Sequence, residues 1–514
     1  MSKTIIIIGA GLAGLSAALQ AAENGCNVKL VSSLPSERAQ SVMAEGGINA
    51  ALNTKDENDS PEEHFTDTIK AACGLADPNA VWGMTQAAPE LVHWLLKLGV
   101  KFNMSGYDDV DLRNFGGQKK KRTAFAQSDT GKQIMTAMID AVRRKEASGM
   151  VERFSHHSFL TLRLCGNICC GCVIRDEYSQ ETVELPGDAV IVATGGMHGL
   201  FGNTTGSLSN TGEVTAELFR LGVPLANGEM IQYHPTTVKC GGKRMLISEA
   251  ARGEGGRLFA MKDGKQWYFM EEKYPELGNL MPRDITAREI WKVSHKSEVF
   301  LDMTEISEEI ISNKLSGLAD DCMTYLHKDI RKEPVSVLPG IHYFMGGILV
   351  DEQHRTPIQN LYAAGECCAQ YHGANRLGGN SLLGALYGGR VAAKSACEQA
   401  DVVDLSCATQ IDFPPASQIS EIKQLNKVMQ ETMGVVRNEN TLLNGIQTVQ
   451  ALTGNLPLLG MAVLKSALAR KESRGAHWRE DYPKSNDNDY LKTTVARFDG
   501  KQIQISFVPV PERR

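Results

Sequence analysis

A glycine-rich segment, Gly9-Ala10-Gly11-Leu12-Ala13-Gly14, lies near the start of the chain. Its G-x-G-x-x-G spacing falls between an apolar run, Ile5–Ile8, and an Ala- and Leu-rich stretch at 12–24. In a strand–turn–helix unit the first glycine makes the tight turn, the second lets a pyrophosphate approach, and the third lets helix and strand pack closely. The helix N-terminus also presents amides and partial positive charge to phosphates. The segment therefore predicts a dinucleotide-binding site.

The residue that would contact the ribose of this dinucleotide is unusual. An acidic residue is expected about 20 residues after the glycine turn. Here the next apolar run, Val28–Val31, ends in Ser32-Ser33, so hydroxyl groups would have to make that contact. This departure argues against NAD as the dinucleotide.

Two more apolar runs end at glycine in the same way. Residues 189–193 are followed by Thr194-Gly195, and residues 361–364 are followed by Gly365. Continuous apolar runs of this length are typical of parallel strands that are buried on both faces. We therefore expect one parallel sheet whose strands come from distant parts of the chain, with an insertion between them.

These patterns divide the chain into a dinucleotide-binding domain at 1–231 and 340–402, an inserted domain at 232–339, and a C-terminal helical region with a tail at 403–514. Residues 403–416, with paired prolines and no periodicity, are typical of a linker. Two apolar sets after the linker recur at helical spacing. They are Ile419, Ile422, Leu425, Val428 and Met429, and then Leu442, Leu443, Ile446 and Val449.

The composition excludes several classes of protein. With 54 basic and 60 acidic residues in 514, the net charge is −6, whereas nucleic-acid-binding proteins usually carry a basic surface. The basic run at 119–122 is therefore expected to be a solvated loop. No apolar run reaches the roughly 18–20 residues of a membrane span. The first apolar run starts at Thr4, too early for a signal peptide, and twelve scattered cysteines fit reduced thiols, so we expect a cytoplasmic protein.

Four cysteines, Cys165, Cys169, Cys170 and Cys172, lie close together in the sequence. A structural metal site would need two separated ligand pairs or added histidines. The Gly166-Asn167 turn between two alternating apolar segments instead predicts a β-hairpin. We therefore predict hairpin packing and no metal site.

Seven motifs follow one another along the chain: AEGGI, IQYHPT, SEAARGEGG, MPRD, HYFMGGI, GECC with HGANRLGGNSL, and KESRGAHWRED. In this order and spacing they resemble the flavoprotein subunit of fumarate reductases and succinate dehydrogenases. The resemblance implies an α/β fold with a Rossmann-like, glutathione-reductase-type FAD-binding domain, an inserted α+β capping domain and a C-terminal helical region. This agrees with the division made from the apolar patterns.

The resemblance also implies that FAD is the dinucleotide and fumarate or succinate the substrate. The expected FAD contacts are Gly9, Gly11, Ala13, Gly14, Ser32, Ser33, Gln40, Ser41, Ala44, Gly46, Gly47, Thr194, Gly195, Glu213, Glu366, Ser381 and Leu382. A dicarboxylate needs cationic and hydrogen-bonding partners at both ends. By similarity, His342 and Arg376 hold one carboxylate. His234, Ser248 and Glu249 hold the other, with Phe115 beside the substrate.

Arg283, in the MPRD motif, is the expected proton donor. An arginine is an unusual acid because its pKa lies above about 12. The family implies that Glu249 and Arg252 relay a replacement proton to it, while reduced flavin gives a hydride to the alkene. A simpler interpretation makes Arg283 a helix-end ion pair with Asp284.

Two residues depart from the family pattern. Most members have a histidine that bonds covalently to the flavin, and the matching residue here is Gln40, so we expect non-covalent FAD. In this family a non-covalent flavin tends to favour reducing fumarate over oxidising succinate, and Glu45 points the same way. At Glu213-Val214 an Asp-Gly pair would be usual, which leaves FAD contacts there open.

Two alternative functions compete with fumarate reduction. L-aspartate oxidases share several of these motifs, but they place a carboxylate beside the substrate amine where this chain has Phe115-Gly116-Gly117. A scaffold that binds flavin and only docks partners is the other alternative. The chain has no haem-attachment motif and no ferredoxin-type cysteine spacing. We therefore expect electrons to arrive from an iron–sulfur partner subunit, which could also hold the protein at a membrane.

Overall fold

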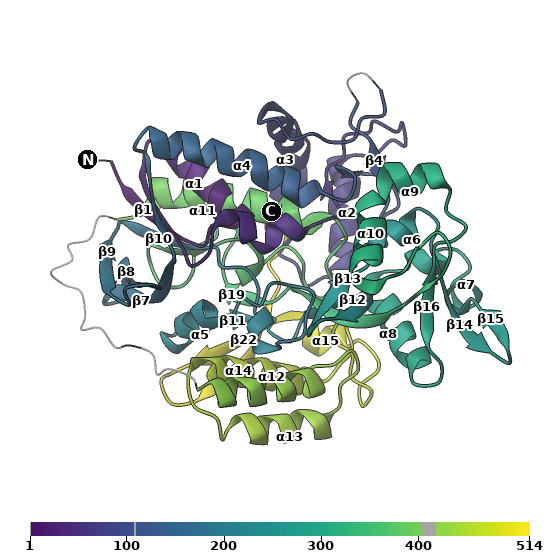
Figure 1. Ribbon diagram of the computed structural model, residues 1–514. Helices are drawn as coiled ribbons and strands as arrows, with labels where there is room; N and C mark the ends of the chain where they lie inside the picture. Colours follow the sequence, from purple (N-terminus) through teal and green to yellow (C-terminus); the bar gives the residue numbers. More distant parts are fainter. Residues whose placement is uncertain (1, 107–108, 402–412, 414–417) are drawn as a thin grey trace.

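The computed structural model describes residues 2–106, 109–401, 413 and 418–514 (Figure 1). Its central element is a five-stranded parallel sheet with the strand order β20-β10-β1-β2-β6. The strands are β1 (Thr4–Ile8), β2 (Asn27–Ser32), β6 (Val151–Ser155), β10 (Ala189–Val192) and β20 (Leu361–Ala363). The expected sheet from distant segments is confirmed. Strand β6 was not predicted, because Glu152 and Arg153 interrupt its apolar pattern.

Both faces of this sheet are covered, which explains why its strands are continuous apolar runs. Ile5 and Ile7 pack against helices, whereas Ile6 and Ile8 pack against a three-stranded sheet. The helices are α1 (Leu12–Glu23), α3 (Pro78–Lys97), α4 (Thr130–Ala147) and α11 (Asn380–Gln399). The covering strands are β7 (His157–Cys165), β8 (Ile168–Asp176) and β9 (Thr182–Pro186).

The turn between β1 and α1 has the geometry that the glycine motif predicts. Gly9 has a φ of +111°, a conformation that favours glycine. A Cβ atom on Gly14 would lie 1.8 Å from the carbonyl oxygen of Gly9. Only a glycine at residue 14 lets the helix approach the strand this closely.

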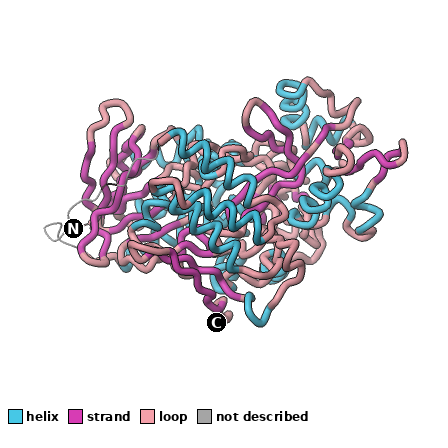
Figure 2. The backbone as a smooth tube through the Cα atoms, turned by 90° about the horizontal axis from the view of Figure 1, so that it is seen from below, coloured by secondary structure: helices cyan, strands magenta, loops and turns pink. Residues whose placement is uncertain are grey.

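Residues 232–339, which we call the capping region, contain a hydrophobic core of their own, joined from outside by Phe115. The first strand, β12 (Ile231–Cys240), pairs antiparallel with β18 (Leu338–Phe344), so the two ends of the region lie side by side. Figure 2 shows the region at the opposite end of the molecule from β7–β9. Its other elements are β13 (Lys243–Leu246), β14 (Arg257–Lys262), β15 (Lys265–Trp267), β16 (Val299–Asp302), β17 (Val335–Ser336), α6 (Glu249–Gly253), α7 (Phe269–Lys273), α8 (Arg283–Ser294), α9 (Glu308–Lys314) and α10 (Ser316–Asp321).

The C-terminal region contains the helices α12 (Ile419–Thr432), α13 (Glu439–Val449) and α14 (Asn455–Ala469). Leu425, Met429, Leu442 and Val449 are buried as the helical spacing predicts. Ile419 and Leu443 are instead exposed, because each lies on the outer side of its helix. No helix in the described ranges is long and apolar enough to cross a membrane. Apart from residue 413, the expected linker at 403–416 lies outside the described residues.

The tail after these helices is a hairpin, which the sequence analysis did not predict. Strands β22 (Lys492–Phe498) and β23 (Ile503–Pro509) extend a second sheet in the order β21-β19-β11-β22-β23. The other strands are β11 (Leu225–Ala226), β19 (Gly347–Leu349) and β21 (Cys368–Ala369). The sequence of β22 lacks a strand pattern, because Thr494, Val495 and Ala496 are buried in succession instead of at alternate positions.

The basic run at 119–122 is only partly a solvated loop. Arg122 is fully buried, and its guanidinium pairs with Asp59 at 2.8 Å and Asp67 at 3.0 Å. Burying a guanidinium without such partners is strongly destabilising, and neither acid is near Arg122 in the sequence. The expectation was therefore wrong for Arg122.

The cysteine-rich segment forms the predicted hairpin of β7 and β8. Cys169, Cys170 and Cys172 are buried, and no metal-type group of His, Cys, Asp or Glu occurs among the described residues. The remaining elements are β3 (Ile48–Asn49), β4 (Leu112–Arg113), β5 (Thr123–Ala124), α2 (Pro61–Ala71), α5 (Glu213–Arg220) and α15 (Asp487–Tyr490), with the short helical turns η1 (Ser36–Arg38), η2 (Gln40–Met43), η3 (His198–Leu200), η4 (Gly278–Leu280), η5 (Cys322–Leu326) and η6 (Gly365–Cys367).

Candidate active site

A cavity of about 570 Å³ runs from the glycine turn after β1 to the capping region. Every expected FAD contact except Gly14 lines it, as do all the expected substrate contacts. Gly14 lies behind the wall, where it sets the packing of helix against strand. Arg252 is also outside this cavity and reaches it through Glu249. The structure therefore brings together residues that are separated by more than 300 positions in the sequence.

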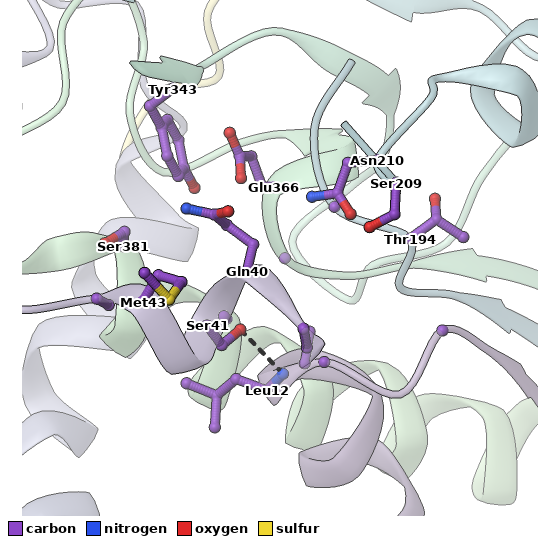
Figure 3. A pocket seen from close by; sticks show the side chains of 18 of the residues that line it. Leu12, Gln40, Ser41, Met43, Thr194, Ser209, Asn210, Tyr343, Glu366 and Ser381 are labelled. Carbon is purple, nitrogen blue, oxygen red and sulfur yellow. Dashed lines mark hydrogen bonds between the residues drawn. The ribbon is translucent and has the colours of Figure 1, made fainter. Parts of the chain in front are cut away.

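One end of the cavity suits a dinucleotide. Gly9 and Gly11 lie at the N-terminus of α1, where the amide of Leu12 donates to Ser41 Oγ at 3.2 Å (Figure 3). Ser32 Oγ, at the end of β2, is buried and has no hydrogen-bond partner in the described structure. A buried hydroxyl without a partner is costly, and a ribose hydroxyl would satisfy it. The residues present therefore fit FAD.

Gln40 lies in η2 and points across the cavity toward Tyr343 and Glu366 (Figure 3). Glu366 accepts a hydrogen bond from the backbone amide of Phe344 at 3.1 Å, which fixes its carboxylate at the cavity wall. Glu213 also lines the cavity, at the first residue of α5. The Glu213-Val214 departure therefore changes the side chain at a position that still faces the cavity.

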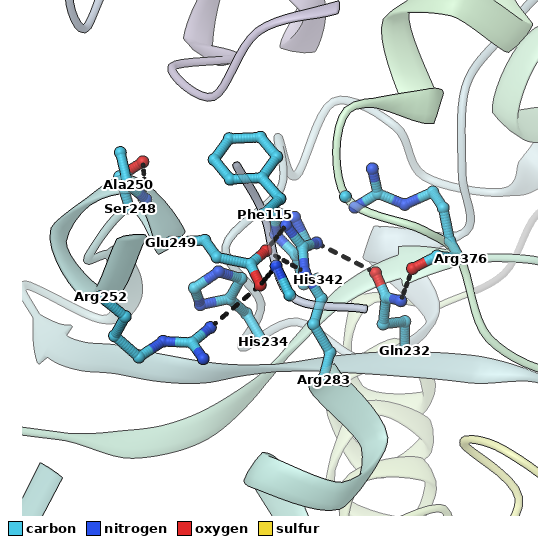
Figure 4. Close-up of polar contacts among 12 residues, drawn as sticks. Phe115, Gln232, His234, Ser248, Glu249, Ala250, Arg252, Arg283, His342 and Arg376 are labelled. Atoms are coloured by element: carbon cyan, nitrogen blue, oxygen red, sulfur yellow. Dashed lines mark hydrogen bonds and ion pairs between the residues drawn. The ribbon is translucent and has the colours of Figure 1, made fainter. Parts of the chain in front are cut away.

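Three charged residues form a line at the other end of the cavity (Figure 4). The Glu249 carboxylate lies 2.6 Å from Arg283 Nη2 and 3.3 Å from Arg252 Nη2. All three residues are buried. Burial would raise the pKa of Glu249, but Arg283 and Arg252 more than offset it and hold this pKa below its usual range. Glu249 is therefore an ionised carboxylate shared by two guanidiniums.

Asp284 does not pair with Arg283, as the simpler interpretation of the MPRD motif would require. The Asp284 carboxylate instead accepts a hydrogen bond from Asn375 Nδ2 at 2.9 Å. Arg283 turns the other way, where Nε donates to Glu249 at 2.8 Å and Nη1 donates to Gln232 Oε1 at 3.1 Å. Its side chain is only 8% exposed. The helix-end ion pair is therefore absent.

Arg376 has no ion pair or side-chain hydrogen bond among the described residues. Its guanidinium stacks on the ring of Tyr343 at 4.2 Å, and Nε is buried without a partner. Burial, reinforced by Arg283, lowers the pKa of Arg376 to about 9. A buried guanidinium that lacks a charged partner at a cavity wall is a site for an anion.

The two expected histidines lie on the neighbouring strands β12 and β18, with ring centres 5.0 Å apart. Burial, together with the neighbouring arginines, holds the pKa of His234 well below its ordinary value; for His342, burial is followed by His234 and then Arg283. Both rings are therefore neutral near pH 7 and act as hydrogen-bonding groups. His342 Nδ1 lies 2.8 Å from Thr205 Oγ1. The positive charge of the site is therefore carried by its arginines, and the histidines are available as hydrogen-bonding partners.

Several residues at the cavity were missed. Gln232 is fully buried and contacts both arginines: its side chain binds Arg283, and its Nε2 donates to the carbonyl oxygen of Arg376 at 2.8 Å. Tyr343 and Thr205 hold Arg376 and His342. Gln232 and Tyr343 lie inside the IQYHPT and HYFMGGI motifs, which could have drawn attention to them. Nothing in the sequence near Thr205 links it to His342.

Known proteins match this sequence over its whole length. Residues 4–382 match the model of an FAD binding domain, and residues 452–513 match that of the fumarate reductase flavoprotein C-terminal region. The chain is 37% identical to the succinate dehydrogenase flavoprotein subunit of Bacillus subtilis, with all of this chain and 98% of that protein aligned. It is 32% identical to the 8-methylmenaquinol:fumarate reductase flavoprotein subunit of Wolinella succinogenes, over 100% of this chain and 92% of that one.

Solved structures give the same result. A mutant of FrdA from E. coli quinol fumarate reductase superposes with a TM-score of 0.90 at 28% identity, covering 99% of this chain and 97% of that one. Sdh1 of Mycobacterium smegmatis superposes with a TM-score of 0.84 at 29% identity, covering 100% and 95%. The fold and site define an FAD-dependent oxidoreductase that acts on a CH–CH bond. The chain belongs to the succinate dehydrogenase and fumarate reductase flavoprotein family.

Glu45 has an unusual carboxyl group at the cavity wall. Its Oε2 atom is buried without a hydrogen-bond partner in the described structure. Burial, reinforced by the nearby Asp321 carboxylate, raises the pKa of Glu45 from 4.5 to about 8. The folded protein therefore keeps a proton on Glu45 that the unfolded chain loses above pH 4.5.

We predict that Glu45→Gln stabilises the flavin-free protein progressively more as the pH rises from 5 to 8. The contribution of Glu45 to stability is complete below its unfolded pKa and is lost as the pH rises toward about 8, whereas glutamine does not titrate. The melting temperatures of wild type and variant should differ by several degrees more at pH 8 than at pH 5. Glu152→Gln, at an exposed residue, is the control. A difference that does not change with pH would contradict the prediction.

Proposed function

We propose that this protein reduces fumarate to succinate with non-covalently bound FAD, as the flavoprotein subunit of a larger enzyme. The observation that carries the proposal is the placement of Arg283. Its guanidinium faces the cavity between Glu249 and Gln232, and the unpaired Arg376 lines the same cavity. This arrangement supports binding of an unsaturated diacid beside a group that can give it a proton.

The charges at this end of the cavity match a dicarboxylate. Arg252, Arg283 and Arg376 carry three positive charges and Glu249 carries one negative charge, which leaves a formal charge of +2. A bound fumarate dianion would neutralise it. Because the site is buried, these charges interact more strongly than they would in water. We expect Arg376 and His342 to hold one carboxylate, with His234 and Ser248 at the other.

The proton is the part of the reaction that this chain's own residues supply. When FAD is bound and reduced, it provides a hydride for one carbon of the double bond. Arg283 donates a proton to the other carbon, so that hydride and proton together convert the alkene to succinate. Arg283 then regains a proton relayed from Arg252 through the Glu249 carboxylate, which contacts both guanidiniums, and Arg252 is reprotonated from solvent. These contacts allow Arg283 to be reprotonated while the capping region still excludes water from the cavity.

Gln40 and Glu45 support the reductive direction. Gln40 has no ring nitrogen that could bond to the flavin, and in this family a non-covalent flavin tends to favour fumarate reduction. The relatives carry names of both kinds, succinate dehydrogenase and fumarate reductase, so their names do not choose between the directions. The proposed direction of the reaction therefore rests on Gln40 and Glu45.

Electrons must reach the flavin from outside the chain. We expect an iron–sulfur subunit to supply them, because the sequence has no cysteine spacing of the haem or ferredoxin type. Fumarate would then serve as the terminal electron acceptor of anaerobic respiration on the cytoplasmic side, with any membrane attachment made by partner subunits.

A single assay tests the proposed function. The purified protein, loaded with FAD, is mixed with a chemically reduced viologen dye and fumarate, succinate or L-aspartate. We expect fumarate to cause rapid dye oxidation, and neither succinate nor L-aspartate to do so. Absence of fumarate-dependent oxidation would contradict the proposal. Peroxide formed from L-aspartate in air would instead identify an aspartate oxidase.

Replacing Arg283 should remove the proton donor. We predict that Arg283→Lys and Arg283→Ala lower kcat for fumarate reduction by at least about 10²-fold, while flavin absorbance and melting temperature change little. Arg257→Lys is a matched control, since Arg257 also pairs with a glutamate at 2.7 Å but lies outside the cavity. An Arg283→Ala enzyme with full activity would show that the proton comes from another group.

Gln40 should leave the flavin extractable. We predict that acid precipitation releases all of the FAD into the supernatant, because Gln40 cannot form the bond that a histidine forms. The measurement is flavin absorbance in the pellet and supernatant. Yellow colour retained in the washed pellet would mean that another residue bonds the flavin.

A further inference from the structure

A chain of buried amides joins the two arginines that reach the cavity from different parts of the fold. Asn375 Nδ2 donates to Asp284 Oδ1 at 2.9 Å, and Asn375 Oδ1 accepts from Gln232 Nε2 at 2.9 Å. Gln232 Oε1 in turn accepts from Arg283 Nη1 at 3.1 Å. Asn375 and Gln232 are 3% and 0% exposed, so water does not compete for these hydrogen bonds.

This series of hydrogen bonds links the capping region to the rest of the molecule. Asp284 follows Arg283 at the start of α8, whereas Asn375 precedes Arg376 in the segment before α11. Each residue is thus one position away from an arginine of the site. Because consecutive Cα atoms are only about 3.8 Å apart, holding Asp284 against Asn375 also fixes the separation of Arg283 and Arg376.

The donors and acceptors in this series of hydrogen bonds allow only one orientation of the two amide groups. The Arg283 guanidinium can only donate, so the Gln232 oxygen must face Arg283. The Gln232 NH₂ group is left facing Asn375 and the carbonyl oxygen of Arg376. The Asn375 amide must then present its oxygen to Gln232 and its NH₂ group to Asp284. The hydrogen bonds therefore run in one direction from the Arg283 guanidinium through two amides to the Asp284 side chain on α8.

We propose that Asn375 and Asp284 are positioning residues that latch α8 to the segment bearing Arg376 and, through Gln232, aim Arg283 at the substrate. The inference rests on the proposed function, because it assigns these residues an effect on proton donation. Neither residue lines the cavity, so they act through the arginines. Loss of the latch should slow the proton-transfer step more than it weakens substrate binding.

Single replacements test the latch. We expect Asn375→Ala and Asp284→Ala each to lower kcat for fumarate reduction by about 10-fold or more, with KM changed less than about 3-fold. The solvent deuterium isotope effect on kcat should rise, because a misdirected Arg283 makes proton transfer rate-limiting. The double variant should be no slower than the slower single variant, because both remove the same contact. Asn360→Ala is the control: Asn360 is also buried and hydrogen-bonded on both sides, but to Asp401 outside the site.

An exchange of the two side chains provides a second test if the alanine variants fold poorly. N375D should be slow, because two carboxylates would face each other. In N375D/D284N the amide at position 284 can donate to the carboxylate at position 375, which still accepts from Gln232. We expect the double variant to recover kcat at least about 5-fold over N375D, with the isotope effect returning toward that of the wild type.

The outcomes separate the latch from the proposed function. A wild-type enzyme that reduces fumarate, with alanine variants of unchanged kcat and isotope effect, would overturn the latch alone. Slow alanine variants with an unchanged isotope effect, and no recovery in N375D/D284N, would reduce the pair to a structural contact and also overturn it. A wild-type enzyme that does not reduce fumarate would overturn the proposed function and the latch together.

Discussion

The site depends on keeping three guanidiniums out of water with only one carboxylate among them. Glu249 serves two of these cations, and Arg376 is left with the ring of Tyr343. Removing charges from water costs several kcal/mol per ion unless partners replace the lost hydration. The rest of the molecule provides those partners only in part. The lost hydration that these partners do not replace favours the binding of a doubly charged anion.

This constraint explains the state of the neighbouring groups. The histidines are neutral because they are buried and because more positive charge would be unfavourable beside the arginines. Glu45 keeps its proton because it is buried and lies near Asp321 instead of an arginine that pairs with it. Burial and the neighbouring charges together set the protonation state of each group. The chemical character of the site is thus a property of the cluster more than of any one residue.

The sequence predicted the sheet and the glycine turn, because each depends on a local pattern, and the resemblance to the family supplied many of the residues that line the cavity. Apolar runs that end at glycine are visible along the chain, and so is the spacing of Gly9, Gly11 and Gly14. Contacts between distant segments were not predictable in this way. The burial of Arg122 depends on Asp59 and Asp67, and the true partner of Asp284 lies about 90 residues away at Asn375. The hairpin of β22 and β23 was missed because β22 shows no alternation of apolar and polar residues.

The tail hairpin affects how the chain can assemble. Strand β11 lies between β19 and β22 in the second sheet, so its edge stays open until residues 492–498 have left the ribosome. An unpaired strand edge of this kind invites pairing with other chains. Strand β21 pairs with β19 in the same sheet and begins two residues after Glu366, whose carboxylate lines the cavity. This part of the cavity wall therefore adjoins a sheet whose β11 edge is closed only by a segment about 270 positions further along the chain.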